Sequence, residues 1–210
     1  MIFWDLDGPI LDVSEKYYYV YRDILTGLNQ RTLTKNEFWN YKRSKKSLFD
    51  ILSKTNSEKL LNKFSELWIK NIETYKYQKL DRLQNGALEI LSKISNDNEL
   101  VMVTLRRNRQ RLLEQLDELN LKHYFKSILS SGEDLKPRWK IKFNLINEYL
   151  LNSHNHNHMI IGDTETDIVA GNNLGFYTIG LLCGIRNKKL IDSKPDKLLN
   201  ETLELMDFFS

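Results

Sequence analysis

The first twelve residues constrain the fold more than any other part of the chain. An apolar run from Ile2 to Leu6 contains Asp5 and leads directly into Asp7 and Gly8. A short apolar run of this kind favours a buried strand, and α/β sheets bind ligands at the carboxyl ends of their strands. Glycine permits a sharp turn and a close approach of the backbone to a ligand. The pattern therefore predicts an α/β protein with two carboxylates at the ligand-binding edge of its sheet.

The chemistry of the two carboxylates points to a metal or to phosphate. Mg²⁺ is typically held by one or two carboxylates together with phosphate oxygens and water. An aspartate can also attack phosphorus and form an acyl-phosphate. Asp5 and Asp7 are therefore candidates for metal binding and for catalysis. On this segment alone, ordinary acidic turn residues after a buried strand remain the alternative.

Two later segments also run from an apolar strand into a polar residue. Residues 99–104 end in Thr104 after four apolar residues, as a buried parallel strand would. Residues 159–162 lead into Asp163, and Asp167 follows four positions later. Asp163 is predicted to join the acidic cluster, to cap the next helix, or to do both. Asp167 is predicted to lie beside it on the first helical turn.

These segments resemble the sequence motifs of the haloacid dehalogenase (HAD) superfamily, in its phosphoglycolate phosphatase-like branch. They resemble motifs I, II and IV in family order, at Asp5, Asp7, Gly8 and Asp12, at Thr104, and at Asp163 and Asp167. Pro9 departs from the threonine or valine that members usually carry at this position. The resemblance implies a Rossmann-like core with a parallel sheet.

The region from residue 13 to about residue 80 differs in composition from the rest of the chain. It is rich in aromatic residues, contains Gly27 as its single glycine and has no proline. Apolar residues recur at helical spacing, which predicts about four helices with Thr34 or Asn36 near one helix start. The segment resembles the C1-type helical cap of HAD enzymes. We therefore expect a cap over residues 14–80 and a core over residues 1–13 and 81–210.

The resemblance implies a Mg²⁺-dependent phosphohydrolase that acts on a small phosphorylated metabolite. Asp5 is expected to attack phosphorus, and Asp7 to act as general acid and then as general base. Mg²⁺ is expected on Asp5, the Asp7 carbonyl and Asp163, with Asp167 as a supporting acceptor. Thr104 and one lysine are expected to stabilise the phosphoryl group in the transition state of its transfer.

The identity of that lysine stays open at the level of sequence. Lys142 precedes Leu145 and Ile146 in an amphipathic segment, as the family lysine often does, and is the preferred candidate. Lys136 precedes proline, which is another form found in the family, and Lys140 has no comparable local pattern.

Further residues are candidates for substrate contact. Gly8 brings the backbone close to the site, and Leu105 and Arg106 follow Thr104 directly. A guanidinium such as that of Arg106 or Arg107 can bind a phosphate or carboxylate in bidentate fashion, although such runs are more often solvated. In the cap, Lys42 and Arg43 belong to a cationic run that either meets a second anionic group of the substrate or is plain surface.

Three other functions remain as alternatives. A sugar-phosphate mutase uses the same residues as a phosphatase, and a non-catalytic phosphate-binding or partner-binding protein can share the fold. A dehalogenase needs neither Asp7 nor Asp163, so these residues disfavour it. The run His154, His156 and His158 could bind Zn²⁺ or Ni²⁺, but its Asn/Ser context is typical of a loop.

Composition limits the cellular setting. The single cysteine, Cys183, excludes an intramolecular disulfide and suits a reducing compartment such as the cytoplasm. No apolar stretch is long enough for a transmembrane helix, and no secretory signal is predicted. The net charge of +3 comes from interspersed residues without a basic stripe, so no nucleic-acid partner is expected. The sequence predicts no oligomeric state.

Overall fold

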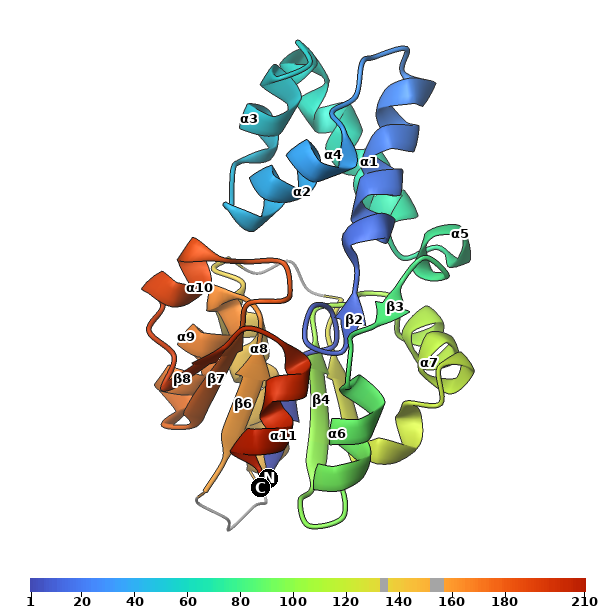
Figure 1. Ribbon diagram of the computed structural model, residues 1–210. Helices are drawn as coiled ribbons and strands as arrows, with labels where there is room; N and C mark the ends of the chain where they lie inside the picture. Colours follow the sequence, from blue (N-terminus) through green and yellow to red (C-terminus); the bar gives the residue numbers. More distant parts are fainter. Residues whose placement is uncertain (133–135, 152–156) are drawn as a thin grey trace. The chain divides into compact units, whose positions relative to one another are not determined.

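The computed structural model describes residues 1–132, 136–151 and 157–210 of the chain (Figure 1). Two compact units are present. Met1–Asp12 and Leu83–Ser210 form one unit, called the core below, and Val13–Arg82 form the other, called the cap. No helix among the described residues is long and apolar enough to cross a membrane.

The core is built on a six-stranded sheet with the order β5-β4-β1-β6-β7-β8, in which every described pair is parallel. The strands are β1 (Ile2–Trp4), β4 (Leu100–Thr104), β5 (Ser127–Ser130), β6 (Met159–Gly162), β7 (Tyr177–Leu181) and β8 (Lys197–Leu199). The predicted α/β class with a parallel sheet is confirmed. Parallel pairing places all carboxyl ends at one edge, where the site residues were expected.

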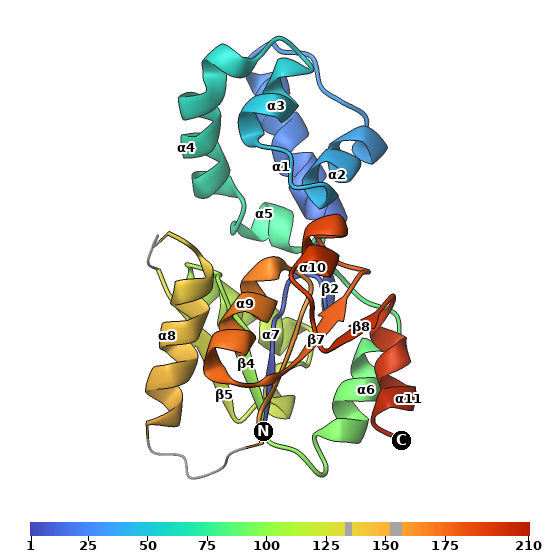
Figure 2. The ribbon, with the colours of Figure 1, turned by 90° about the vertical axis from the view of Figure 1, so that its left-hand side faces the viewer.

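Helices cover both faces of this sheet, as a parallel sheet requires. The helices α8 and α9 lie on one face, and α6 and α11 lie on the other (Figure 2). The helical segments of the core are α6 (Ala87–Ile94), α7 (Arg109–Glu118), η2 (Lys122–Tyr124), α8 (Trp139–Leu150), α9 (Glu165–Leu174), α10 (Lys188–Asp192), η3 (Thr202–Glu204) and α11 (Leu205–Phe208). Under α8 and α9, the side chains of Phe3, Val101 and Ile160 pack with Ile146.

Two details of the sheet differ from the sequence prediction. The first strand ends at Trp4 instead of continuing to Leu6, so Asp5 and Asp7 both lie in the turn that follows it. The strand β5 was not predicted, because Ser127–Ser130 is short and only half-buried, and lacks the long apolar run of the central strands. The central strand β4 is buried along its whole length, which explains its continuous apolar sequence.

The cap is all-helical except at its ends. Its helical segments are α1 (Ser14–Gly27), α2 (Lys35–Arg43), α3 (Leu48–Ser53), η1 (Glu58–Leu60), α4 (Leu61–Asn71) and α5 (Tyr75–Gln78). The chain passes between core and cap through the two-stranded sheet of β2 (Leu11–Asp12) and β3 (Arg82–Leu83). Thr34 caps α2 and Ser47 caps α3, each through a reciprocal capping box.

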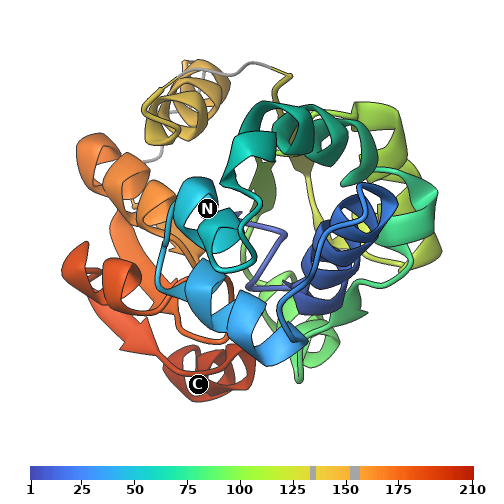
Figure 3. The same ribbon diagram turned by 90° about the horizontal axis from the view of Figure 1, so that it is seen from above.

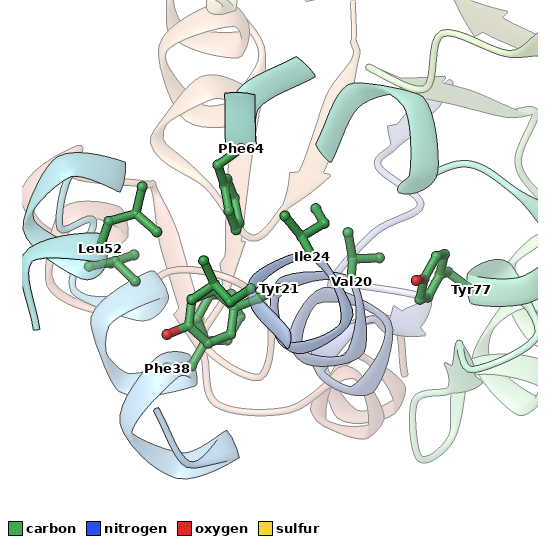
Figure 4. Packing of buried hydrophobic residues seen from close by; sticks show 9 residues of the cluster. Val20, Tyr21, Ile24, Phe38, Leu52, Phe64 and Tyr77 are labelled. Carbon is green, nitrogen blue, oxygen red and sulfur yellow. The ribbon is translucent and has the colours of Figure 1, made fainter. Parts of the chain in front are cut away.

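Aromatic side chains form the centre of the cap. The rings of Tyr21 and Phe38 stack with their centroids 4.4 Å apart, and Phe64 packs against Tyr21 from α4 (Figure 4). The helix α1 contacts both α2 and α4 (Figure 3). These contacts show that the aromatic stripe of the sequence is largely the apolar interior of the cap.

A buried ion pair joins the two ends of the cap segment. The Nζ of Lys16, in the first turn of α1, lies 2.8 Å from Asp81 Oδ2, just before β3. The two side chains are only 2% and 0% exposed. The pair therefore links the entry of the cap to its exit across 65 residues of sequence.

Candidate active site

Three of the predicted site residues meet at the carboxyl edge of the sheet. Asp5 follows β1, Thr104 ends β4 and Asp163 follows β6, and these three strands are neighbours in the sheet. The backbone N–H of Asp5 donates to the carbonyl of Ile161 at 3.0 Å, which extends the sheet pairing to the aspartate itself. The position of Asp5 is therefore set by the main chain of the two central strands.

A group of carboxylates forms the centre of the site. Oxygen atoms of Asp5, Asp163 and Asp167 all lie within 4.8 Å of one another. Asp163 is fully buried; its Oδ2 accepts the backbone N–H of Ile185, and its Oδ1 has no hydrogen-bond partner among the described residues. Clustered carboxylate oxygens of this kind are the ligands that Mg²⁺ prefers.

Of the three candidate lysines, Lys142 is the one that lies at Asp5. Its Nζ is 2.8 Å from Asp5 Oδ2 and also donates to Asp167 Oδ1, and the residue is 1% exposed. Lys136 and Lys140 are exposed. The reason is helical geometry, because Lys142 shares a face of α8 with Ile146, and that face packs on the sheet.

Burial and neighbouring negative charges raise the pKa values of Asp5 and Asp163. Burial raises the pKa of Asp5 to about 7; the charge of Lys142 opposes the shift, and the charge of Asp167 adds to it. The pKa of Asp163 is raised well above its ordinary value, first by burial and then by Asp5 and Asp167. Burial alone would lower the pKa of Lys142, but Asp167 and Asp5 raise it above its ordinary range. The charged form of the lysine is therefore favoured, and the surplus of carboxylates favours a further positive charge in the cluster.

Asp167 is held in place from two sides. Its Oδ2 accepts from the N–H of Thr164 at 3.1 Å and from the Thr164 hydroxyl at 2.8 Å, while its Oδ1 accepts from Lys142. The N-cap residue of helix α9 is Thr164, which follows Asp163 directly, so Asp163 itself does not cap the helix. Asp163 is thereby left to face the other acids.

Glycines make room for the buried carboxylate of Asp163. Gly8 has a φ of +110°, and a Cβ on it would lie 2.1 Å from Asp163 Oδ2. A Cβ on Gly184 would lie equally close to the same oxygen, at 2.1 Å. Any side chain at either position would therefore collide with the acid, which identifies Gly184 as a site residue that the sequence analysis missed. The glycine after the strand β7 is the signal that could have indicated it.

The carboxylate of Asp7 contacts Arg106, whereas that of Asp5 contacts Lys142. Asp7 Oδ2 accepts from Nε of Arg106 at 2.7 Å, and Asp7 Oδ1 accepts from Nη2 at 2.6 Å. Arg106 Nη1 donates to Gln115 Oε1 on α7 at 3.0 Å. The structure thus places Arg106, which was expected to meet the substrate, on Asp7, while Leu105 beside it is half-buried. Gln115 was not predicted, because a single polar residue on a helix carries no local signal.

The cationic run of the cap has partners within the cap. The Nζ of Lys42 lies 5.1 Å from the ring centroid of Tyr17 and 5.4 Å from that of Trp68, within the range of a cation–π contact. Lys42 also borders a cavity of about 230 Å³ that Phe38 and Phe64 help to line. Arg43 is half-buried at the end of α2. Contact of Lys42 and Arg43 with a substrate stays a prediction.

The histidine run is described only at its last member. His154 and His156 lie outside the described residues. His158 is buried, with its ring 5.9 Å from that of Phe3 and 5.1 Å from that of Phe176 between centroids. This imidazole therefore packs as an aromatic ring in the core.

Comparison with known proteins identifies the family. The model of the haloacid dehalogenase-like hydrolases matches residues 2–181, which is most of the chain. The chain belongs to the haloacid dehalogenase-like hydrolases. The family predicted from the sequence motifs is thus confirmed, and with it the assignment to a family of hydrolases. Among curated proteins, no significant match was found.

Solved structures of this family share the fold along the whole chain. The haloacid dehalogenase-like protein SP0104 from Streptococcus pneumoniae is 18% identical with a TM-score of 0.80, over 100% of this chain and 97% of that one. A predicted phosphoglycolate phosphatase from Haemophilus somnus is 18% identical with a TM-score of 0.71, over 100% and 97%. YfnB from Bacillus subtilis, assigned to the HAD hydrolases and bound to magnesium, is 20% identical with a TM-score of 0.71, over 100% and 97%.

Proposed function

We propose that this member of the family is a Mg²⁺-dependent phosphomonoester hydrolase that acts on a small phosphorylated metabolite. The observation that carries the proposal is the environment of Asp5. Its carboxylate lies at the carboxyl edge of the sheet between an ammonium group, on Lys142, and a group of buried acids. A nucleophile, a fixed cation for phosphate and ligands for a metal are thereby brought together.

The residues at this edge fit a divalent cation. Asp5, the main-chain carbonyl of Asp7 and Asp163 would hold Mg²⁺, with Asp167 adjacent. The carboxylates of the site outnumber its cations, and one oxygen of the buried Asp163 has no hydrogen-bond partner among the described residues. When bound, Mg²⁺ neutralises charge on a phosphate and on the acids around it. The magnesium bound to YfnB is consistent with this assignment.

The chemistry divides between Asp5 and Asp7. In the first step, an Asp5 oxygen attacks phosphorus, the ester P–O bond breaks, and Asp7 gives a proton to the leaving oxygen, so that an alcohol departs. In the second step, water attacks the aspartyl-phosphate, Asp7 takes a proton from the water, and the bond between phosphorus and Asp5 breaks to release phosphate. Thr104 and Lys142 contribute a hydroxyl and an ammonium toward the charged oxygens of the phosphoryl group.

The substrate class of the proposed enzyme is a small phosphate ester. The phosphatase assignment of the Haemophilus somnus protein supports this class. We place the enzyme in the cytoplasm, because its single cysteine suits a reducing compartment.

Release of phosphate from p-nitrophenyl phosphate tests the proposal. We expect turnover with millimolar Mg²⁺, loss of turnover with EDTA, and recovery when Mg²⁺ is added back. Asp163→Asn should weaken activation by Mg²⁺, whereas Asp196→Asn, an exposed acid at β8, should not. Turnover that is indifferent to EDTA, or no turnover on a panel of phosphate esters, would contradict the proposal.

A further inference from the structure

Arg106 is, like Lys142, a buried cation of the site, and the proposed chemistry assigns no role to it. Its side chain is only 3% exposed. A buried guanidinium requires hydrogen-bond acceptors, and those of Arg106 include both carboxylate oxygens of Asp7 and the side-chain oxygen of Gln115. The contacts join the turn after β1 to the segment after β4, with Asp7 and Arg106 99 residues apart in sequence, and Gln115 extends them to α7.

The geometry of the contact fixes the carboxylate of Asp7. Two parallel N–H···O bonds, of 2.7 and 2.6 Å, orient the plane of the carboxylate as a single bond would not. Gln115 in turn fixes the guanidinium, and the N–H of Arg106 donates to the hydroxyl of Thr104 at 3.3 Å. Asp7 is therefore anchored to the same strand end that carries Thr104.

From these contacts we infer that Arg106 is a positioning residue that holds Asp7 as the general base of the second step. The inference rests on the proposed function, since it assigns a role within that reaction. A base must be correctly placed when water attacks the aspartyl-phosphate, and the two hydrogen bonds from the guanidinium fix the placement of the Asp7 carboxylate. Gln115 supports Arg106 and acts one contact further from Asp7.

With an aryl phosphate as substrate, formation of the aspartyl-phosphate and its hydrolysis can be measured separately. The leaving group of the aryl phosphate departs without a proton, so formation of the aspartyl-phosphate does not need Asp7, while hydrolysis of the intermediate does. The ratio kcat/KM reports only the steps up to departure of the leaving group, whereas kcat also includes hydrolysis. A defect in positioning the base therefore lowers kcat and KM together and leaves kcat/KM nearly constant.

The experiment uses p-nitrophenyl phosphate with Mg²⁺ and compares Arg106→Met and Arg106→Lys with the natural protein. Each variant should lower kcat by about tenfold or more, as expected when a general base loses its placement, with kcat/KM changed by less than about twofold. Rapid mixing should show a burst of nitrophenol that approaches one per protein. Arg109→Met is the matched control, since this exposed arginine of α7 donates to the Ile128 carbonyl, and it should show neither effect.

Further variants keep the inference open to contradiction. Arg106→Met added to Asp7→Asn should cause no further loss, because Arg106 acts through Asp7. If the arginine variants fail to fold, Gln115→Leu should show the same fall in kcat to a smaller degree. An equal loss of kcat and kcat/KM, or no loss of either, would overturn the inference. A natural protein that releases no nitrophenol would instead contradict the proposed function.

Discussion

The core and the cap each bury a lysine against carboxylates, and the two arrangements differ in their balance of charge. In the cap, Lys16 meets Asp81 at 2.8 Å in a buried pair of opposite charges. In the core, Lys142 meets Asp5 at 2.8 Å and also Asp167, and Asp163 lies beside both acids. The cap pair sets one positive charge against one negative charge, whereas the core group sets three carboxylates against the single ammonium of Lys142.

The difference indicates what each arrangement is for. A buried pair that loses one partner leaves an uncompensated charge, so both members of the cap pair are needed for stability. Removal of one acid from the core group relieves repulsion between like charges. We therefore expect substitutions at the cap pair to affect folding, and substitutions at the core group to affect chemistry. The shift in the pKa of Asp5 to about 7 has the same origin, because burial and neighbouring acids disfavour its charge.

The largest expected effect tests the core half of this comparison. Asp5→Asn should lower kcat on p-nitrophenyl phosphate by at least about a thousandfold, because the amide cannot attack phosphorus. Its melting temperature should stay equal to that of the natural protein or rise, since one buried negative charge is removed. Steady-state kinetics and thermal unfolding in EDTA measure the two quantities. A variant that keeps a tenth of the activity would show that Asp5 is not the nucleophile.

The role of the buried ion pair in the cap is tested by removing one of its two members. Lys16→Met or Asp81→Asn should each lower the free energy of unfolding of the cap by about 3–5 kcal/mol, as is typical when one partner of a buried pair is removed. Denaturant titration followed by tryptophan fluorescence measures this loss, since Trp39 and Trp68 lie in the cap.

Two comparison variants sharpen the result for the cap. Lys16→Met combined with Asp81→Leu should recover much of the stability, because no charge is then buried without a partner. Lys76→Met removes an exposed cation from Asp23 and should cost less than about 1 kcal/mol. If the Asp5→Asn variant proves as unstable as Lys16→Met, the contrast between core and cap is wrong.

The smallest of the three expected effects is a fall in kcat/KM that distinguishes Lys142 from the other two candidate lysines. Lys142→Ala should lower kcat/KM by about a hundredfold, the typical cost of losing one group that stabilises charge in the transition state. Lys140→Ala, on the same helix but exposed, and Lys136→Ala should each change it by less than about twofold, since a solvated cation far from the phosphate contributes little. If Lys136→Ala is the inactive variant, the assignment of this lysine must be revised.

Local patterns were sufficient to predict the fold class and the placement of the principal acids. An apolar strand that ends in a polar residue can be recognised from adjacent residues alone, as at Thr104 and Asp163. Parallel sheets then bring the carboxyl ends of such strands to one edge, so Asp5 and Asp163 meet for reasons that the sequence already contains. The edge strand at Ser127–Ser130 lacked this pattern and was not predicted.

The partners of these residues were decided by the tertiary structure. Helix α8 turns Lys142 toward Asp5 and leaves Lys140 in solvent. The sequence pattern favoured Lys142 and left Lys136 open as the alternative. Arg106 reaches Asp7 across 99 residues, and Lys16 reaches Asp81 across 65. Periodicity and motifs report which face of an element is buried. They do not report which distant side chain lies opposite, because that depends on how the completed layers pack.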